Sequence, residues 1–162
     1  YCRWRTDRVK EYFEILKQKN KRSIYPIDFD YRLPTKEEWE RVARVGNSLK
    51  TIKKLETKYE GQKTSNLKRG KGDSLGVAEN LNDSADITAP VQSYWPNKYG
   101  LYNLIGNVAE ITSVKGIAKG GSWMHLEKEV DVEKDFEYSK PTQWLGFRCV
   151  FIVKDSKLIQ GE

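Results

Sequence analysis

The chain has 162 residues, enough for one domain with a sizeable core and too few for two full domains. Aromatic residues make up 12% of it, which excludes a disordered chain, because disordered segments are poor in aromatic side chains. The net charge of +6 would suit an acidic protein, a nucleic acid or a membrane surface as partner. No apolar stretch is long enough to span a bilayer, and no signal peptide is recognisable. Because the first residue is not Met, we expect a fragment of a longer protein.

The first predicted element is an amphipathic helix over residues 6–19. Thr6 is expected to cap it, because a hydroxyl at this position accepts a hydrogen bond from the first turn. Its apolar residues recur at i, i+3, i+4 and i+7, the spacing of one helical face: Val9, Tyr12, Phe13 and Leu16. A polar, irregular connection is predicted for residues 20–30. The two cysteines, Cys2 and Cys149, allow one disulfide at most, and two buried thiols are the simpler interpretation.

A capping box predicts the second helix. Thr35 precedes Glu38 by three residues, the spacing at which side chain and backbone satisfy each other. Apolar residues follow on one face, and Gly46 is expected to end the helix. The buried stripe comprises Trp39, Val42 and Ala43.

The remainder of the sequence is rich in turn residues. Residues 47–76 lack hydrophobic periodicity and predict a long loop, with a short exposed helix fitting 50–60. Short strands are predicted at 108–112, 116–119 and 147–153. Two helices followed by short strands and irregular aromatic segments indicate an α+β domain with much irregular structure.

Four segments in this order resemble the formylglycine-generating enzyme, or sulfatase-modifying factor, family with its C-type-lectin-like fold. The resemblance makes residues 1–153 the C-terminal part of one such domain, with a basic insertion at 49–72 and a tail at 154–162. The matching segments are YRLPTKEEWE (31–40), TAPV (88–91), YGLYNLIGNVAE (99–110), and GGSW (120–123) with GFRC (146–149).

Within the family, residues 2–9 and 115–121 are most similar to the gliding-motility and type IX secretion lipoproteins GldK, PorK and GldJ. That similarity implies a structural, protein-binding subunit on the periplasmic face of the outer membrane, anchored by a lipid upstream of Tyr1. It also implies a protein partner of the GldN or PorN type in a large ring assembly, in a Bacteroidetes-type bacterium.

The resemblance also indicates which chemistry is missing. The family's oxidase binds copper through two cysteines that follow the Gly-Gly-Ser-aromatic motif, and soft thiolates are what Cu(I) requires. Here His125 and Val130 stand at those two positions. We therefore expect no copper and no catalysis. Two alternatives stay open: an enzyme of the same fold with altered chemistry, as in the sulfoxide synthases, and a calcium-dependent lectin-like binding module.

Calcium is the cofactor that the resemblance predicts. The first site would take side-chain oxygens from Asn103 and Glu110 and backbone carbonyls from Gly106 and Val108, a donor set that suits Ca²⁺. A turn held only by hydrogen bonds of Asn107 and Glu110 to the backbone is the alternative. A second, less complete site would comprise Asn80, Leu81, Asp83 and Ala85.

The charge excess lies in the basic insertion. Eight basic and two acidic side chains within 49–72 account for the whole net charge. A solvated loop is one interpretation, and docking to an acidic partner or lipid head group is the other. The residues concerned are Lys50, Lys53, Lys54, Lys58, Lys63, Lys68, Arg69 and Lys71. No nucleic-acid motif appears. Four tryptophans in or near the motifs are expected to pack in the core rather than form a carbohydrate platform: Trp39, Trp95, Trp123 and Trp144.

Overall fold

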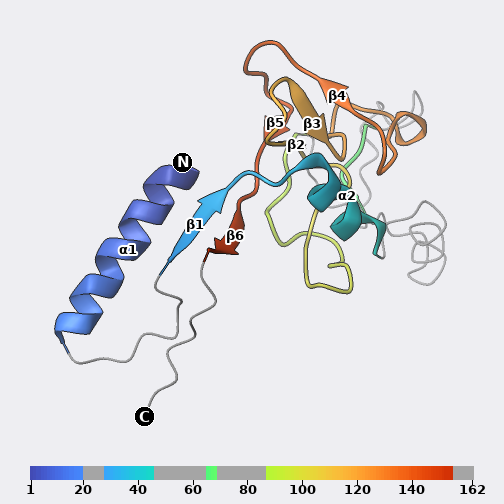
Figure 1. The fold of residues 1–162 in the computed structure, drawn as a ribbon. Coiled ribbons are helices and arrows are strands. Elements are labelled where there is room, and N and C mark those ends of the chain that lie inside the picture. Colours follow the sequence, from blue (N-terminus) through green and yellow to red (C-terminus); the bar gives the residue numbers. More distant parts are fainter. Residues whose placement is uncertain (20–27, 46–64, 69–86, 155–162) are drawn as a thin grey trace. The chain divides into compact units, whose positions relative to one another are not determined.

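The computed structural model describes residues 1–19, 28–45, 65–68 and 87–154 (Figure 1). They belong to two compact units, one from Tyr1–Pro34 with Arg148–Glu162 and the other from Thr35–Phe147. Over these described ranges, no helix has the length and apolarity that a membrane span needs.

The first unit begins with helix α1, Cys2–Gln18, which starts four residues before the predicted start. The expected capping role of Thr6 is wrong, because Tyr1 is the N-cap and Thr6 lies four residues into the helix, where its side chain is buried. Its hydroxyl donates to the Cys2 carbonyl at 3.2 Å and accepts from the Tyr31 amide at 2.8 Å. Thr6 therefore ties the helix to the strand beneath it instead of starting the helix.

That strand is β1, Phe29–Arg32, which pairs antiparallel with β6, Val150–Val153. The irregular connection predicted for 20–30 is thus wrong at its last two residues, whereas the strand predicted at 147–153 is confirmed in its second half. Aromatic contacts join helix to strands, with Phe13 and Phe29 centroids 5.8 Å apart. Tyr12 is 57% exposed and does not belong to the packed face.

The two cysteines meet in the first unit. The Cys2 and Cys149 sulfurs lie 2.8 Å apart, and both residues are half-buried free thiols rather than fully buried ones. Burial, followed by the hydrogen bond with Cys2, raises the pKa of Cys149 to about 11. The Cys149 thiol is therefore protonated at neutral pH.

The second unit begins with α2, Lys36–Arg44, and the predicted capping box is confirmed. Thr35 Oγ1 accepts from the Glu38 amide at 3.2 Å, and Glu38 Oε2 accepts from the Thr35 amide at 2.8 Å. Trp39 and Ala43 are buried, as the apolar stripe predicts. The proposed terminator, Gly46, lies outside the described residues.

A four-stranded sheet lies in the same unit, in the order β4-β3-β2-β5. Only the β2–β5 pairing is parallel, and a short 3₁₀ helix, Glu127–Glu129, lies between β3 and β4. Two strands confirm the predictions at 108–112 and 116–119. The other two have two residues each and carry no periodicity that a sequence could reveal. The strands are β2 (Ala109–Ile111), β3 (Ile117–Lys119), β4 (Phe136–Glu137) and β5 (Leu145–Gly146).

The core of this unit lies between α2 and the sheet. Its buried apolar residues are Trp39, Ala43, Leu104, Ile105, Ala109, Ala118, Val130, Val132 and Phe136. Leu67, within the predicted loop 47–76, packs against this cluster, and Lys68 forms a bridge with Leu126. The predicted helix at 50–60 lies outside the described residues.

An ion-pair network joins α2 to the sheet. Lys119 is fully buried, and its ammonium group contacts Glu40 at 2.8 Å and Asp135 at 3.0 Å. Lys36 completes the network on Asp135 at 2.6 Å. Two carboxylates thus compensate the buried charge at the end of β3, where the functional segments begin.

Candidate functional site

The segment in which the resemblance predicts the two cysteine positions follows β3 directly. His125 Nδ1 accepts from the Ser122 amide at 3.1 Å and lies 2.8 Å from Ser122 Oγ. An amide hydrogen can be accepted only by an unprotonated nitrogen, so Nδ1 carries no proton. The imidazole ring packs against Phe136 and Trp144, with centroids 4.5 and 5.3 Å away. Burial lowers the pKa of His125, and the charge of Glu129 opposes that shift more weakly.

The second of these positions is part of the core. Val130 is 3% exposed, and a Cβ placed on Gly121 would lie 2.5 Å from one of its methyl carbons. Gly121 has a φ of 67°, so a side chain there would meet both backbone strain and a clash. An imidazole engaged by Ser122 and a packed isopropyl group therefore lie where the resemblance predicts the two thiols. Across the described ranges, no three His, Cys, Asp or Glu side chains gather as a metal site.

The turn predicted to bind calcium adjoins this segment. Asn103, Gly106 and Asn107 have φ values of 51°, 79° and 64°, which bend the chain sharply before β2. The Gly106 amide donates to the Gly120 carbonyl at 2.9 Å, and a Cβ at Gly106 would lie 2.5 Å from the Asn66 carbonyl oxygen. Glycine is required here by both the backbone conformation and the close approach.

The Asn103 amide is held by one end only. Its nitrogen donates to the carbonyls of Pro90 and Val91 at 3.2 and 3.1 Å. Two acceptors can be met only by an NH₂ group, so the orientation of the amide follows from chemistry. Its oxygen is buried and accepts no hydrogen bond within the described part of the chain. A buried acceptor without a donor costs free energy unless a cation takes that place.

Glu110 provides the carboxylate of the turn. It is 5% exposed, and its Oε2 accepts from the Trp39 indole nitrogen at 2.7 Å. An amide oxygen without a donor among the described residues, a buried carboxylate and the backbone carbonyls of Gly106 and Val108 are oxygen ligands of the types that Ca²⁺ takes. Asn107 matches the alternative, because it exchanges two hydrogen bonds with the Ala89 backbone.

Two other predicted sites lie almost entirely outside the described residues. These are the second calcium segment, comprising Asn80, Leu81, Asp83 and Ala85, and the basic insertion except Lys68. The Lys68 side chain is exposed, and its amide donates to the His125 carbonyl at 2.9 Å.

Sequence reasoning missed an exposed aromatic loop, residues 87–101. Trp39 packs in the core as predicted, but Trp95 is 42% exposed and Tyr99 is 62% exposed. The prediction of core packing is therefore wrong for Trp95. Asn97 and Asn103 hold this loop by hydrogen bonds to backbone groups that are distant in sequence or lie within the loop itself. In the sequence, only the recurrence of Asn residues could have indicated these contacts.

Comparisons with known proteins agree with this arrangement. The family model of the sulfatase-modifying factor enzyme 1-like domain matches residues 1–153. The formylglycine-generating enzyme of Mus musculus is 42% identical over 85 residues, 51% of this chain and 22% of that protein. The inactive C-alpha-formylglycine-generating enzyme 2 of Bos taurus is 36% identical over 134 residues, 73% of this chain and 43% of that protein.

A solved structure shares the fold. Treponema denticola variable protein 1 has a TM-score of 0.52 and 24% identity, covering 74% of this chain and 47% of that one. The chain spans less than half the length of each of these relatives. The α+β fold is thus the fold of formylglycine-generating enzymes, and relatives described as inactive are among the matches. The chain belongs to the family of sulfatase-modifying factor enzyme 1-like domains.

Proposed function

We propose that the chain is a non-catalytic, protein-binding member of this family. One observation carries the proposal: at the two positions where the resemblance predicts the cysteine pair, the side chains of His125 and Val130 are engaged in hydrogen bonding or core packing. Neither can supply the thiolate that Cu(I) requires. Relatives described as inactive, at 36% and 35% identity, support the same conclusion.

We further infer a role in the type IX secretion and gliding machinery, at the periplasmic face of the outer membrane. The similarity of residues 2–9 and 115–121 to the GldK, PorK and GldJ lipoproteins supports this role. The partner would then be a protein of the GldN or PorN type, and the membrane would be reached through a lipid anchor upstream of Tyr1. Calcium bound by the turn at 103–110 would be structural.

Oxygen uptake tests the non-catalytic half of the proposal. The purified chain is supplied with Cu(I), a thiol reductant and a cysteine-containing peptide, and oxygen consumption is followed with an electrode. We expect the same rate as with free copper. The double variant His125→Cys/Val130→Cys is the matched control, since it restores both sulfurs and should bind Cu(I). Peptide-dependent uptake by the wild-type chain would show that the chain is an enzyme.

Association with the partner tests the other half. We expect the chain to form a complex with a purified GldN- or PorN-type protein in size-exclusion chromatography. A variant with Lys50, Lys53, Lys54 and Lys58 replaced by Gln keeps the buried Asn66 and the partly buried Leu67, and it should bind more weakly at low salt if the basic insertion contributes charge. Equal binding by that variant would assign the insertion to solvent, and no complex with the wild-type chain would contradict the proposed partner.

A further inference from the structure

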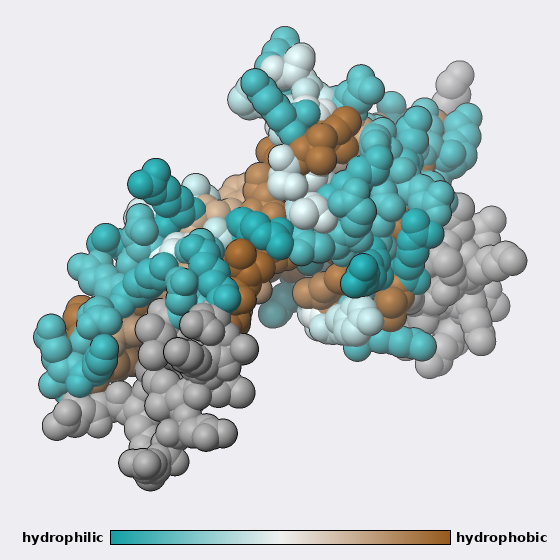
Figure 2. All heavy atoms as spheres, viewed as in Figure 1, coloured by the Kyte–Doolittle hydropathy of each residue, from teal (hydrophilic) through white to brown (hydrophobic). Residues whose placement is uncertain are grey.

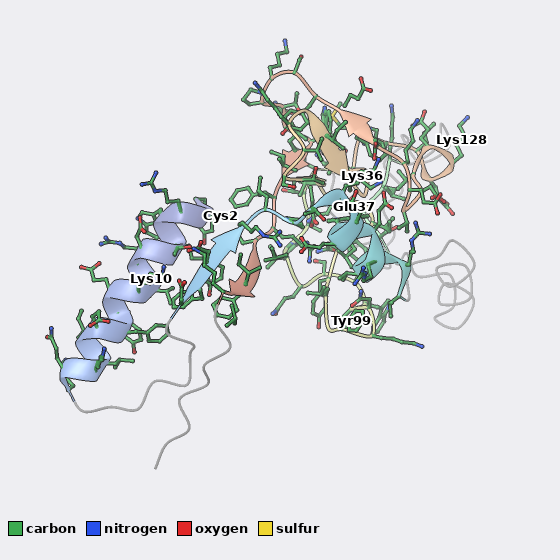
Figure 3. The ribbon with its side chains drawn as sticks, in the orientation of Figure 1. Cys2, Lys10, Lys36, Glu37, Tyr99 and Lys128 are labelled. Atoms are coloured by element: carbon green, nitrogen blue, oxygen red, sulfur yellow. The ribbon has the colours of Figure 1, made fainter. Side chains whose placement is uncertain are left out.

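Asn97 holds the backbone of the exposed aromatic loop through hydrogen bonds of its side chain. Asn97 is 8% exposed, and its oxygen accepts from the amides of Tyr99 and Leu101 at 2.9 and 3.1 Å. Its nitrogen donates to the Val42 carbonyl of α2 at 3.0 Å. The loop therefore has an anchored backbone at one end, while the Trp95 and Tyr99 side chains are partly exposed. Figure 3 shows Tyr99 at the end of the loop remote from the four-stranded sheet.

The surface of this loop has the composition of a protein interface. Ile87 and Val91 are 55% and 81% exposed, in addition to the two aromatic rings. Between residues 87 and 109 there is no carboxylate, and Lys98 is the one charged side chain. Figure 2 shows brown and pale atoms gathered over this part of the second unit. Exposed Trp and Tyr side chains are typical of binding hot spots.

The other end of the loop, at Pro90 and Val91, is held by Asn103, which is also one of the predicted calcium ligands. Its nitrogen holds the carbonyls of Pro90 and Val91, while its oxygen is the buried acceptor described above. One amide group thus joins the surface segment to the turn. A cation on the oxygen would fix the amide plane and polarise the NH₂ group, which strengthens both hydrogen bonds to the loop.

We propose that calcium at Asn103 orders the aromatic loop and so controls how Trp95 and Tyr99 are presented to a protein partner. The partner surface would be an apolar patch with an acidic edge, which complements the two rings and Lys98. The partner half rests on the proposed function, whereas the coupling between Asn103 and the loop does not.

Hydrogen exchange with Ca²⁺ alone tests the coupling. The amides of Ser93, Asn97 and Gly100 donate to carbonyls within the loop, so their exchange rates report its order. Adding Ca²⁺ should slow them by about tenfold or more. The amides of α2 serve as the internal control and should change little. Calcium binding, measured by calorimetry, without slower exchange in the loop would overturn the proposal, as would the absence of binding.

Two substitutions of Asn103 separate calcium binding by its oxygen from the hydrogen bonds that its nitrogen donates to the loop. Asn103→Asp keeps an oxygen for the cation and adds charge, but has no NH₂ group to donate to the two carbonyls. It should bind Ca²⁺ at least as tightly as the wild-type chain and show no calcium effect on loop exchange. Asn103→Ala should lose both. A wild-type response from Asn103→Asp would show that the link does not pass through this amide.

The docking role is tested with the double variant Trp95→Ser/Tyr99→Ser and the purified GldN- or PorN-type protein. The wild-type chain should bind at least about tenfold more weakly in EGTA than in Ca²⁺, and the variant about tenfold more weakly in Ca²⁺. Val91→Ser, on the same loop, serves as a single-site comparison. Binding that is equal in all forms overturns the docking surface. Failure of the wild-type chain to bind at all contradicts the proposed partner, and the exchange experiment still decides the coupling.

Discussion

The segment around His125 and the turn around Asn103 differ in how their polar groups are used. In the first, Ser122 contacts the ring nitrogen of His125, and Val130 packs in the core at the position predicted for the second cysteine. In the second, Asn103 retains a buried oxygen without a donor among the described residues. The first segment is thus filled by packing and hydrogen bonding, whereas the second keeps a buried acceptor that a cation would satisfy. The contrast is what the proposed non-catalytic, calcium-binding role predicts.

The largest expected effect comes from the residue that both regions share. Gly120 has a φ of 89°, its carbonyl accepts from the Gly106 amide, and it directly precedes the Gly121–Ser122 segment. A Cβ there would lie 2.3 Å from the Leu104 carbonyl oxygen. Gly120→Ala should lower the free energy of unfolding by about 3 kcal/mol, measured by urea denaturation.

Gly100 offers the matched control for that substitution. It also has a positive φ, 75°, but its Cβ would meet no atom within 4 Å. Gly100→Ala should therefore show the cost of the conformation alone, about 1 kcal/mol. Equal losses for the two variants would mean that the close contact at Gly120 is relieved by small movements.

Calcium removal should have the next largest effect. With Ca²⁺ at about a hundredfold excess over its Kd, binding to the folded state alone adds about 2.7 kcal/mol. The melting temperature should therefore fall in excess EGTA and recover when Ca²⁺ is restored, as followed by calorimetry. Asn103→Ala should melt at the same temperature in both buffers. An unchanged wild-type melt, with no calcium found by elemental analysis, would remove the metal from the turn and end the contrast between the two regions.

The contacts within this fold were predictable from the sequence to different degrees. The capping box of α2 involves residues three apart, so its pattern is visible in the sequence and was confirmed. The hydrogen bonds of Asn103 reach carbonyls 12 and 13 residues away, which no local pattern reveals. For the same reason the strands β4 and β5 were missed, since each is defined by its pairing in the sheet. Thr6 misled because a hydroxyl suits a helix cap as well as a buried contact.

Replacing Val130 tests whether the second cysteine position is purely structural. Val130→Ala removes two methyl groups from the core and should cost about 2 kcal/mol of unfolding free energy in urea. Val91→Ala makes the same chemical change at a side chain that is 81% exposed, and should stay within about 0.5 kcal/mol of the wild-type chain. Similar stabilities for the two variants would contradict a packed Val130.

The smallest expected effect is the pH dependence contributed by His125. Its pKa is lowered in the folded state, chiefly by burial, so the unfolded chain binds this proton more readily. The stability from the neutral ring is therefore complete above the unfolded pKa of about 6.5 and is lost as the pH falls through the folded pKa. A proton on Nδ1 would also abolish the hydrogen bond that this nitrogen accepts from the Ser122 amide. His125→Gln keeps polarity without titrating, so the difference in melting temperature between wild type and variant should grow in favour of the wild type from pH 5 to pH 7 and then level off. A difference that is constant across this range would mean that the ring has the same pKa in the folded and unfolded chain. Burial and the hydrogen bond from Ser122 would then not favour the neutral ring.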